Sequence, residues 1–323
     1  MNKKLGYSIA FALALVAPFI GYPVLLMKLL CFALFACAFN LLIGFTGLLS
    51  FGHAAFFGAA GYVAGNAMKN WGLPFEASVL VAVLAGAALG ALMGGLAIRR
   101  QGIYFSMITL ALAQMVYFGA LRFTDFSGGE DGLQGVPRGK LLGVLDLGSD
   151  LAMYYVVLGI FIAGFALIVR IVHSPFGQVL KAIKENEPRA MSLGYDVDRY
   201  KLAAFVLSAS LAALAGATKT IVLGFETLTD VHWTMSGLVI LMTLVGGMGT
   251  LVGPIIGAIL IIVLENKLGD FGNIMAASTG IEWFTTLGEA VSLVTGLIFV
   301  TCVLLFRKGI VGEILARSKL SSK

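Results

Sequence analysis

Charged residues are scarce in this sequence. Only 12% of its 323 residues are Asp, Glu, Lys or Arg, roughly half the share found in ordinary soluble domains. Hydrophobic residues make up 59% of the chain, and its mean hydropathy is +0.97. A soluble protein of this length needs much more charge to cover its surface, whereas a bilayer-embedded chain needs charge only in its loops. The composition therefore excludes a soluble globular protein and predicts an integral membrane protein.

Cysteine is equally scarce, and the common catalytic motifs are missing. Cys31, Cys37 and Cys302 lie in apolar runs without a CxxC spacing, so we expect buried thiols that form neither disulfides nor metal sites. The sequence contains no HExxH, GxSxG or GxxxxGK[ST] motif. We therefore predict that the chain is not an enzyme, has no catalytic or metal-binding residues and does not bind ATP by itself.

Glycine, in contrast, is abundant, with 41 residues. Several glycines recur every four residues, a spacing that lets membrane helices approach one another closely. These are Gly86, Gly90 and Gly94; Gly61 and Gly65; and Gly249, Gly253 and Gly257. We interpret them as helix-packing seams.

Apolar runs approaching the roughly 20 residues needed to cross a bilayer recur along the whole chain. We predict ten spans, at residues 5–21, 24–43, 50–67, 77–98, 103–122, 151–172, 201–223, 234–246, 252–265 and 288–306. The eighth and ninth are short, so they are either half-helices or one broken span. The first is too long for the core of a cleaved signal peptide, and we interpret it as a retained span. The expected fold is an all-α polytopic membrane protein with 8 to 10 transmembrane helices, in a single domain over residues 1–323.

The predicted loops alternate in charge. Basic residues gather at Lys3 and Lys4, at Arg99 and Arg100, in the segment 170–201 and in the tail after Phe306. The loops 123–150 and 265–289 are acidic instead, with Asp125, Glu130, Asp131, Asp146 and Asp150 in the first and Glu265, Asp270, Glu282 and Glu289 in the second. By the positive-inside rule, both termini and the loop 173–200 are cytoplasmic, and the loop 123–150 lies on the opposite side.

His53 is the most unusual polar residue in the predicted spans. It follows Ser50 and Gly52 in a glycine-containing segment, and unwound backbone at membrane depth is tolerated only where protein or a water-filled cavity satisfies it. The segment is a candidate pathway lining; the competing interpretation is a histidine hydrogen-bonded between helices. A second glycine break in the other half of the chain is typical of inverted-repeat transporters. The candidate translocation pathway therefore comprises Ser50, Gly52, His53, Gly246, Gly247 and Gly249.

The other polar residues of the predicted spans indicate packing more than chemistry. All 17 carboxylates fall in predicted loops or near span ends, unlike those of a proton- or sodium-coupled carrier, which indicates that energy arrives from outside this chain. We expect Lys28 and Lys219 to extend to the membrane interface. Hydrogen bonding between helices is the expected role of most of the uncharged polar residues, Asn40, Ser106, Thr109, Gln114, Ser208, Ser210 and Thr243.

The segment 173–196 is the most informative polar stretch. Phe176, Val179, Leu180 and Ile183 follow the i, i+3, i+4, i+7 spacing of one apolar helix face. A second short helix is predicted to follow Pro188 and to stop at Gly194. Two such helices form either a surface for a partner or a connector that lies on the membrane.

Three stretches together make the chain similar to the LivM-type permeases of bacterial ABC importers for branched-chain amino acids. They are Gly47 to Gly61, with SFGHAAFFGAAG; Ser174 to Ala204, with SPFGQVLKAIKENEPRAMSLGYDVDRYKLAA; and Gly246 to Gly257, with GGMGTLVGPIIG. The second stretch is similar to the cytoplasmic coupling loop that docks on the ATPase subunit. That similarity implies ATPase coupling by Phe176, Glu185, Glu187, Arg189, Ala190 and Gly194. The spacing of the Glu, Ala and Gly is one residue longer than in the commonest version, and the downstream Ile-x-Leu-Pro is missing.

The resemblance implies an assembly with the ABC importer permease fold in the bacterial inner membrane. The expected partners are a homologous second permease, two cytoplasmic ATP-binding subunits and a periplasmic solute-binding protein, with the lipid bilayer around them and no nucleic acid. No cofactor is expected on this chain, because ATP and Mg bind the ATPase subunits. Leucine, isoleucine and valine are the default cargo. Urea, short amides, other amino acids and aromatic acids are alternatives within the family, and a self-sufficient channel or secondary carrier is the alternative from a different class.

Overall fold

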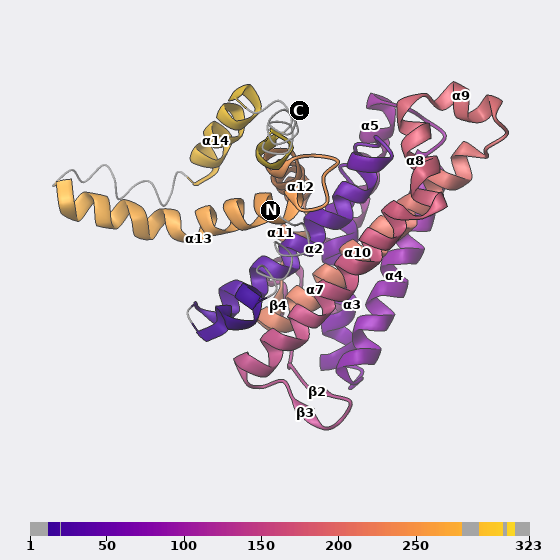
Figure 1. Cartoon of the computed structure of the whole chain (residues 1–323). Helices are drawn as coiled ribbons and strands as arrows, with labels where there is room; N and C mark the ends of the chain where they lie inside the picture. The colour runs from indigo at the N-terminus through magenta and orange to yellow at the C-terminus, as the bar shows by residue number, and fades with distance from the viewer. Residues whose placement is uncertain (1–11, 20, 280–290, 306–308, 314–323) are drawn as a thin grey trace.

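The computed structural model describes residues 12–19, 21–279, 291–305 and 309–313 as a helical bundle (Figure 1). The helices after the first are α2 (Pro23–Phe45), α3 (His53–Lys69), α4 (Phe75–Ala97), α5 (Ile103–Arg122), α6 (Thr124–Ser127), α7 (Asp150–His173), α8 (Pro175–Glu185), α9 (Glu187–Ser192), α10 (Val197–Leu223), α11 (Leu228–Val231), α12 (Trp233–Gly246), α13 (Gly253–Thr279) and α14 (Val291–Leu305).

Five of the described helices are long and apolar enough to cross a membrane, namely α2, α4, α5, α7 and α10. They confirm the predicted spans 24–43, 77–98, 103–122, 151–172 and 201–223. Two further predicted spans correspond to shorter helices, since α3 has 17 residues and α12 has 14. Residues 265–279, predicted as part of an acidic loop, instead continue α13, where Lys267 pairs with Asp270 at 2.8 Å.

Local sequence explains where the polar helices begin. Ser174 caps α8 by accepting a hydrogen bond from Gly177 N, and Pro175 follows at the first helical position. Asn186 caps α9 in the same way, and Asp196 caps α10. The two short helices predicted between residues 173 and 196 are thus confirmed as α8 and α9.

Helix α10 lies at the centre of the bundle, against α2, α3 and α4. Glycines make this close packing possible, as the four-residue spacing predicted. A Cβ atom at Gly90 would lie 2.6 Å from the Ala209 Cβ, and one at Gly216 would lie 1.9 Å from the Phe57 carbonyl oxygen. In contrast, α4 keeps an exposed outer face that includes Leu84 at 60% and Leu92 at 69% exposure, as expected for a helix surface that faces lipid.

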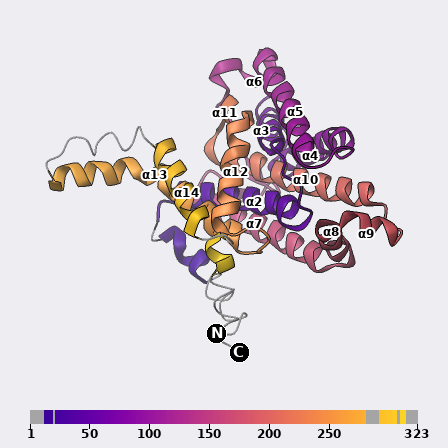
Figure 2. The same ribbon diagram turned by 90° about the horizontal axis from the view of Figure 1, so that it is seen from above.

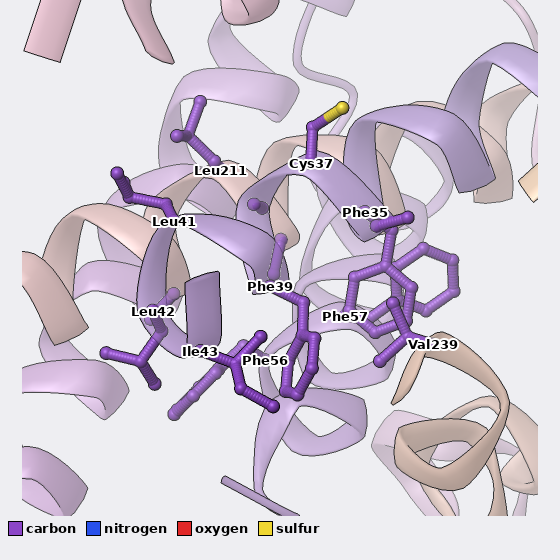
Figure 3. Close-up of a cluster of buried hydrophobic side chains, with 14 of the residues drawn as sticks. Phe35, Cys37, Phe39, Leu41, Leu42, Ile43, Phe56, Phe57, Leu211 and Val239 are labelled. Carbon is purple, nitrogen blue, oxygen red and sulfur yellow. The ribbon is translucent and has the colours of Figure 1, made fainter. Parts of the chain in front are cut away.

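The core beside α10 is aromatic (Figure 3). Phe35 and Phe39 of α2 meet Phe56 and Phe57 of α3 there, and the rings of Phe35 and Phe57 stack with their centroids 4.4 Å apart. The sulfur-containing Cys37 belongs to the same cluster. Cys31 and Cys37 are buried as predicted, whereas Cys302 is only partly buried, because its helix α14 lies at the edge of the bundle.

Two small sheets interrupt the helical architecture. Strand β1 (Leu133–Gln134) pairs antiparallel with β4 (Phe225–Glu226), and β2 (Lys140–Leu141) pairs with β3 (Leu145–Asp146). The all-α expectation missed these strands, because two-residue strands carry no periodicity that a sequence pattern can reveal. The β2–β3 hairpin and the α8–α9 pair lie at opposite ends of the bundle (Figure 1).

Seen from above, α13 extends away from the bundle on the side opposite α4, with α14 beside it (Figure 2). Several predictions lie outside the described residues. These concern Lys3, Lys4, the first part of the span 5–21, Glu282, Glu289, the ends of the span 288–306 and the basic tail residues Arg307, Lys308, Arg317, Lys319 and Lys323.

Candidate functional site

Helix α3 begins inside the bundle, at His53. This residue is fully buried, and its Nε2 lies 2.9 Å from the hydroxyl of Ser208, near the middle of α10. The rings of Phe39, Phe56 and Phe205 surround the imidazole, with centroid distances of 4.9, 5.6 and 6.1 Å. A polar ring thus sits in an aromatic cage at the centre of the helical bundle.

The hydrogen bonds define which tautomer His53 adopts. The Ser208 hydroxyl donates its only hydrogen to the carbonyl oxygen of Ala38 at 2.6 Å, so its bond with His53 requires a proton on Nε2. In the neutral ring, Nδ1 is then a bare acceptor. Nδ1 is buried and has no hydrogen-bond partner among the described residues. Both interpretations of His53 therefore keep some support, since one nitrogen bridges helices and the other is unsatisfied.

The loop between α2 and α3, residues 46–52, is held by side chains from neighbouring helices. The Ser106 hydroxyl donates to Leu49 O at 2.7 Å, and Phe51 N donates to the Thr109 hydroxyl at 3.2 Å. Within the loop, Gly52 N donates to the Ser50 hydroxyl at 3.1 Å. These bonds satisfy non-helical backbone in the interior of the bundle, which membrane proteins require. Ser106 and Thr109 of α5 therefore bond to this loop, where the prediction was a bond to another helix.

The first turns of α3 and α12 meet at this place. Ala54 N donates to the hydroxyl of Ser236 at 2.8 Å, and Ser236 lies in the first turn of α12. From there α3 runs to the end of the bundle that holds β1, where Lys69 Nζ donates to Gln134 O at 2.7 Å. Helix α12 runs the other way and ends at Gly246, beside α2 and α13. Two short helices of opposite direction thus begin side by side within the bundle.

Asn40 of α2 holds the second glycine break against α2. Its side-chain oxygen accepts from Gly249 N at 2.9 Å, and its amide nitrogen donates to Thr250 O at 2.8 Å. Gly249 has a φ of +77°, which glycine adopts without strain. Asn40 therefore bonds from α2 to the loop between α12 and α13, where the prediction was a bond between helices.

The six predicted pathway residues therefore fall into two groups. Ser50, Gly52 and His53 are buried together at the start of α3. Gly246 and Gly247 are buried at the end of α12, whereas Gly249 is exposed. The last turns of α2 connect the two groups.

An open cavity of about 440 Å³ lies next to the first group. Phe51, directly after Ser50, is one wall, and residues of α12, α13 and α14 supply the others: Trp233, Thr234, Gly237, Leu238, Ile240, Leu241, Glu265, Thr295, Gly296 and Phe299. The lining is mainly apolar with a few polar groups, a composition typical of small-molecule sites.

The predicted coupling residues lie on α8, α9 and the turn after α9. Three of them hold the segment to the bundle. Phe176 stacks on Tyr200 at 5.6 Å, Ala190 packs with Ile183 and Val197, and a Glu187 carboxylate oxygen accepts from Lys201 Nζ at 2.6 Å. The other three, Glu185, Arg189 and Gly194, are exposed.

Helix α8 also contacts the end of α2. Lys184 Nζ donates to the carbonyl oxygen of Gly44 at 2.6 Å, and Lys181 Nζ lies 5.8 Å from the centre of the Phe45 ring. Lys184 remains partly exposed, and partial desolvation at this contact lowers the pKa of its ammonium relative to an ordinary lysine. No local sequence pattern indicates this contact, because it joins residues 140 positions apart in the chain.

A buried charge cluster at the other end of α10 was also missed. Lys219 is 3% exposed, and its ammonium contacts Asp230 at 2.5 Å and Glu226 at 3.2 Å. The expectation that Lys219 extends to the membrane interface is therefore wrong. Glu226 and Asp230 are also buried, so the premise that this chain, unlike a coupled carrier, buries no carboxylate is wrong as well. Their desolvation is offset by mutual attraction and by a hydrogen bond from Thr220 to Glu226. The signal was present as a lone lysine in an apolar run with two carboxylates within the next 11 residues.

Long apolar helices with exposed outer faces, packed around polar loops that turn inside the bundle, define a multi-pass membrane protein. A family model described as "Branched-chain amino acid transport system / permease component" matches residues 24–305. The chain therefore belongs to this family of permease components.

Individual relatives have modest identity. The high-affinity branched-chain amino acid transport system permease protein LivM of Escherichia coli is 28% identical over 72% of this chain and 60% of its own length. The chain thus spans about three fifths of the LivM proteins it matches. The fructose import permease protein FruG of Bifidobacterium longum is 27% identical over 76% of this chain and 71% of its own length. The ribose import permease protein RbsC of Escherichia coli is 27% identical over 61% of this chain and 63% of its own length.

Proposed function

We propose that this chain is the transmembrane permease subunit of an ATP-driven ABC importer and that it forms part of the path by which branched-chain amino acids enter a bacterial cell across the inner membrane. The observation that carries the proposal is the match of a branched-chain amino acid permease family to residues 24–305. The contact between α8 and the end of α2 fits this role, because the loop that leads to His53 follows directly and the contact joins an exposed helical pair to the bundle.

The proposed assembly contains a homologous second permease, two cytoplasmic ATP-binding subunits and a periplasmic solute-binding protein. The chain itself is proposed not to be an enzyme and to bind no cofactor, since ATP and Mg bind the ATPase subunits. Glu185, Arg189 and Gly194 are exposed on the α8–α9 segment and are proposed to face the ATPase. Phe176, Glu187 and Ala190 are proposed to support that surface by their contacts with the bundle.

The pathway is proposed to pass the first turns of α3 and α12. Ser50, Gly52 and His53 would line its centre, and Gly246, Gly247 and Gly249 would move with the end of α12. Short helices of opposite direction that begin at the bundle centre are the arrangement that inverted-repeat transporters use for solute binding. We propose 8 to 10 crossings in one transmembrane domain, with residues 173–200 as the cytoplasmic coupling loop and 123–150 as the periplasmic loop.

The similar proteins also point to a second class of transported solute, the sugars. Permeases named for fructose and ribose match this chain at 27% identity, close to the 28% of LivM. A sugar is therefore the alternative substrate. The polar groups that surround the cavity beside Phe51, among them Glu265, Thr234 and Thr295, suit an ammonium or a hydroxyl group.

The test is purification of the chain with its neighbours, followed by transport in proteoliposomes. Gentle detergent extraction is expected to recover a second permease and ATPase subunits with the chain. After reconstitution with the solute-binding protein, L-leucine, D-ribose and D-fructose are offered separately with and without ATP. ATP-dependent uptake of leucine alone supports the proposal. Uptake of a sugar alone would show that the transported solute is a sugar and not a branched-chain amino acid. Uptake by the isolated chain without ATP would instead identify a channel or secondary carrier.

A further inference from the structure

Lys184 lies at the junction between α8 and the end of α2. Its ammonium donates to the Gly44 carbonyl oxygen at 2.6 Å, in the last turn of α2, where carbonyl groups have no partner within the helix. A lysine at this position also interacts favourably with the negative end of the helix dipole. The ammonium forms no ion pair with another residue in the described part of the chain, so Gly44 is its principal polar contact.

The stem of Lys184 contacts the loop that follows. A Cβ atom at Gly47 would lie 3.2 Å from the Lys184 Cγ, so only a glycine leaves the side chain unhindered there. Gly47 has a φ of +78°, which also favours glycine. The same lysine therefore contacts both the last turn of α2 and the loop that continues to Ser50, Gly52 and His53.

The second glycine loop also touches this point. A Cβ atom at Gly44 would lie 2.9 Å from Gly249 N, and Gly249 N donates to the Asn40 side chain one turn earlier in α2. Any displacement of the Gly44 peptide therefore acts on the residues 246–250 as well as on the loop 46–52. Gly249 of the second group therefore lies beside the Gly44 peptide that Lys184 contacts, and the loop that leads to the first group begins two residues after it.

We propose that Lys184 is a positioning residue that transmits movement of α8 to both glycine loops through the Gly44 carbonyl. The inference rests on the proposed function, because it assigns the link between ATPase engagement and the pathway to one side chain. The ammonium is bonded to the last turn of α2. That turn continues into the loop 46–52 and packs on the loop of residues 246–250. Removal of the ammonium uncouples ATP hydrolysis from transport without removing the ATPase docking surface.

The neighbouring Lys181 offers a matched control. It lies on the same helix and carries the same charge, yet its contact with α2 is a cation–π approach to the Phe45 ring at 5.8 Å. Lys181→Met thus removes the same charge from α8 without removing the bond to Gly44. Lys184→Arg keeps a cationic donor at the junction.

The experiment compares the complete complex with its Lys184→Met, Lys184→Arg and Lys181→Met variants in proteoliposomes. Three quantities are measured: subunit composition, ATP hydrolysis rate and solute molecules imported per ATP. The imported probe is whichever of radiolabelled L-leucine, D-ribose and D-fructose the unmodified complex transports. For Lys184→Met we expect import per ATP to fall about tenfold, as for loss of one charged hydrogen bond, with composition and hydrolysis unchanged. We expect Lys184→Arg to keep most of the import per ATP of the unmodified complex, and Lys181→Met to keep nearly all of it.

The remaining outcomes overturn the inference in distinct ways. If Lys184→Met imports as many solute molecules per ATP as the unmodified complex, Lys184 does not transmit movement of α8 to the glycine loops. An equal loss in Lys181→Met shows that the charge of α8 matters rather than the bond to Gly44. Loss of ATPase subunits from the Lys184→Met complex makes Lys184 a docking residue instead. If the unmodified complex imports none of the three probes with ATP, the proposed function fails, and the inference fails with it.

Discussion

Among the described residues, His53 has one nitrogen that is hydrogen-bonded and one that is not, although the whole side chain is buried. Nε2 donates to a serine that is itself fixed to α2, while Nδ1 is a buried acceptor without a partner in the described residues. An unsatisfied buried acceptor costs free energy, about 1–3 kcal/mol. A residue that served only to join helices would not need an unsatisfied acceptor. The unpaired Nδ1 therefore favours a role for His53 in the pathway.

Replacement of His53 by glutamine separates these two features. The glutamine amide can still donate to Ser208 from about the position of Nε2, but it has no acceptor in place of Nδ1. We expect His53→Gln to keep the melting temperature of the detergent-purified complex and to lower uptake by roughly tenfold, the effect of one lost hydrogen bond to a buried group. Ser208→Ala, which breaks both bonds of the serine, is expected to lower the melting temperature instead. Unchanged uptake in His53→Gln would leave the histidine with a structural role only.

The charge cluster of Lys219 makes a prediction about stability. Lys219→Met leaves the buried carboxylates of Glu226 and Asp230 without a counter-ion, and breaking a buried ion pair in this way costs about 3–5 kcal/mol. We expect a large fall in melting temperature, mostly recovered when Glu226→Gln and Asp230→Asn are added. The control is Lys267→Met, because the pair of Lys267 with Asp270 is about 60% exposed and such pairs contribute little. A small effect of Lys219→Met would show that these carboxylates are neutral or hydrated in the native protein.

Packing between elements depends on glycines at particular faces. Within α4, Gly90 faces the Ala209 Cβ of α10, whereas a Cβ atom at Gly95 would lie in open space. We expect Gly90→Leu to destabilise the protein by about 1–3 kcal/mol through overpacking, and Gly95→Leu to have no measurable effect. Thermal unfolding of the two variants in one detergent tests this difference. Equal melting temperatures would mean that α4 does not pack on α10 through its glycine face.

At the scale of elements, the sequence patterns predicted the helices whose formation depends on residues close together in the chain. Apolar length located α2, α4, α5, α7 and α10, and periodicity with capping residues located α8 and α9. Glycine spacing predicted the α4 face that packs on α10, but the partner helix could not be read from it. Contacts between residues far apart in sequence were not predictable, because no local pattern encodes which residues meet in space.

The candidate site shows the same division. The polar character of His53 and the glycine loops was apparent from residue type, since such groups are unusual in apolar runs. Their arrangement was not. Three contacts depend on how α2, α8, α10 and α12 pack. They are the bond of Lys184 to Gly44, the bond of Asn40 to the second glycine break, and the pairing of Lys219 with Glu226 and Asp230.

The whole molecule has two chemically different ends. The β2–β3 hairpin lies at one end, where the Leu142 amide donates to Glu76 at the start of α4. The basic residues Arg99 and Arg100 follow the other end of α4, near the α8–α9 pair, and Gln101 donates to Glu187 at 2.8 Å. Helix α4 therefore runs from the end of the bundle that holds the acidic loop 123–150 to a basic loop at the other end, as the charge pattern predicts for a membrane-spanning segment.

Cysteine labelling in intact cells tests the orientation of these two ends. Val144 in the hairpin is 86% exposed, and Arg100 is exposed beyond the end of α4. In a Cys302→Ser background, with the buried Cys31 and Cys37 retained, we expect a membrane-impermeant maleimide to label Val144→Cys in intact spheroplasts. Arg100→Cys is expected to be labelled only after the membrane is permeabilised. The opposite pattern would place the α8–α9 pair outside the cell, where it could not meet a cytoplasmic ATPase, and the proposed importer would have to be abandoned.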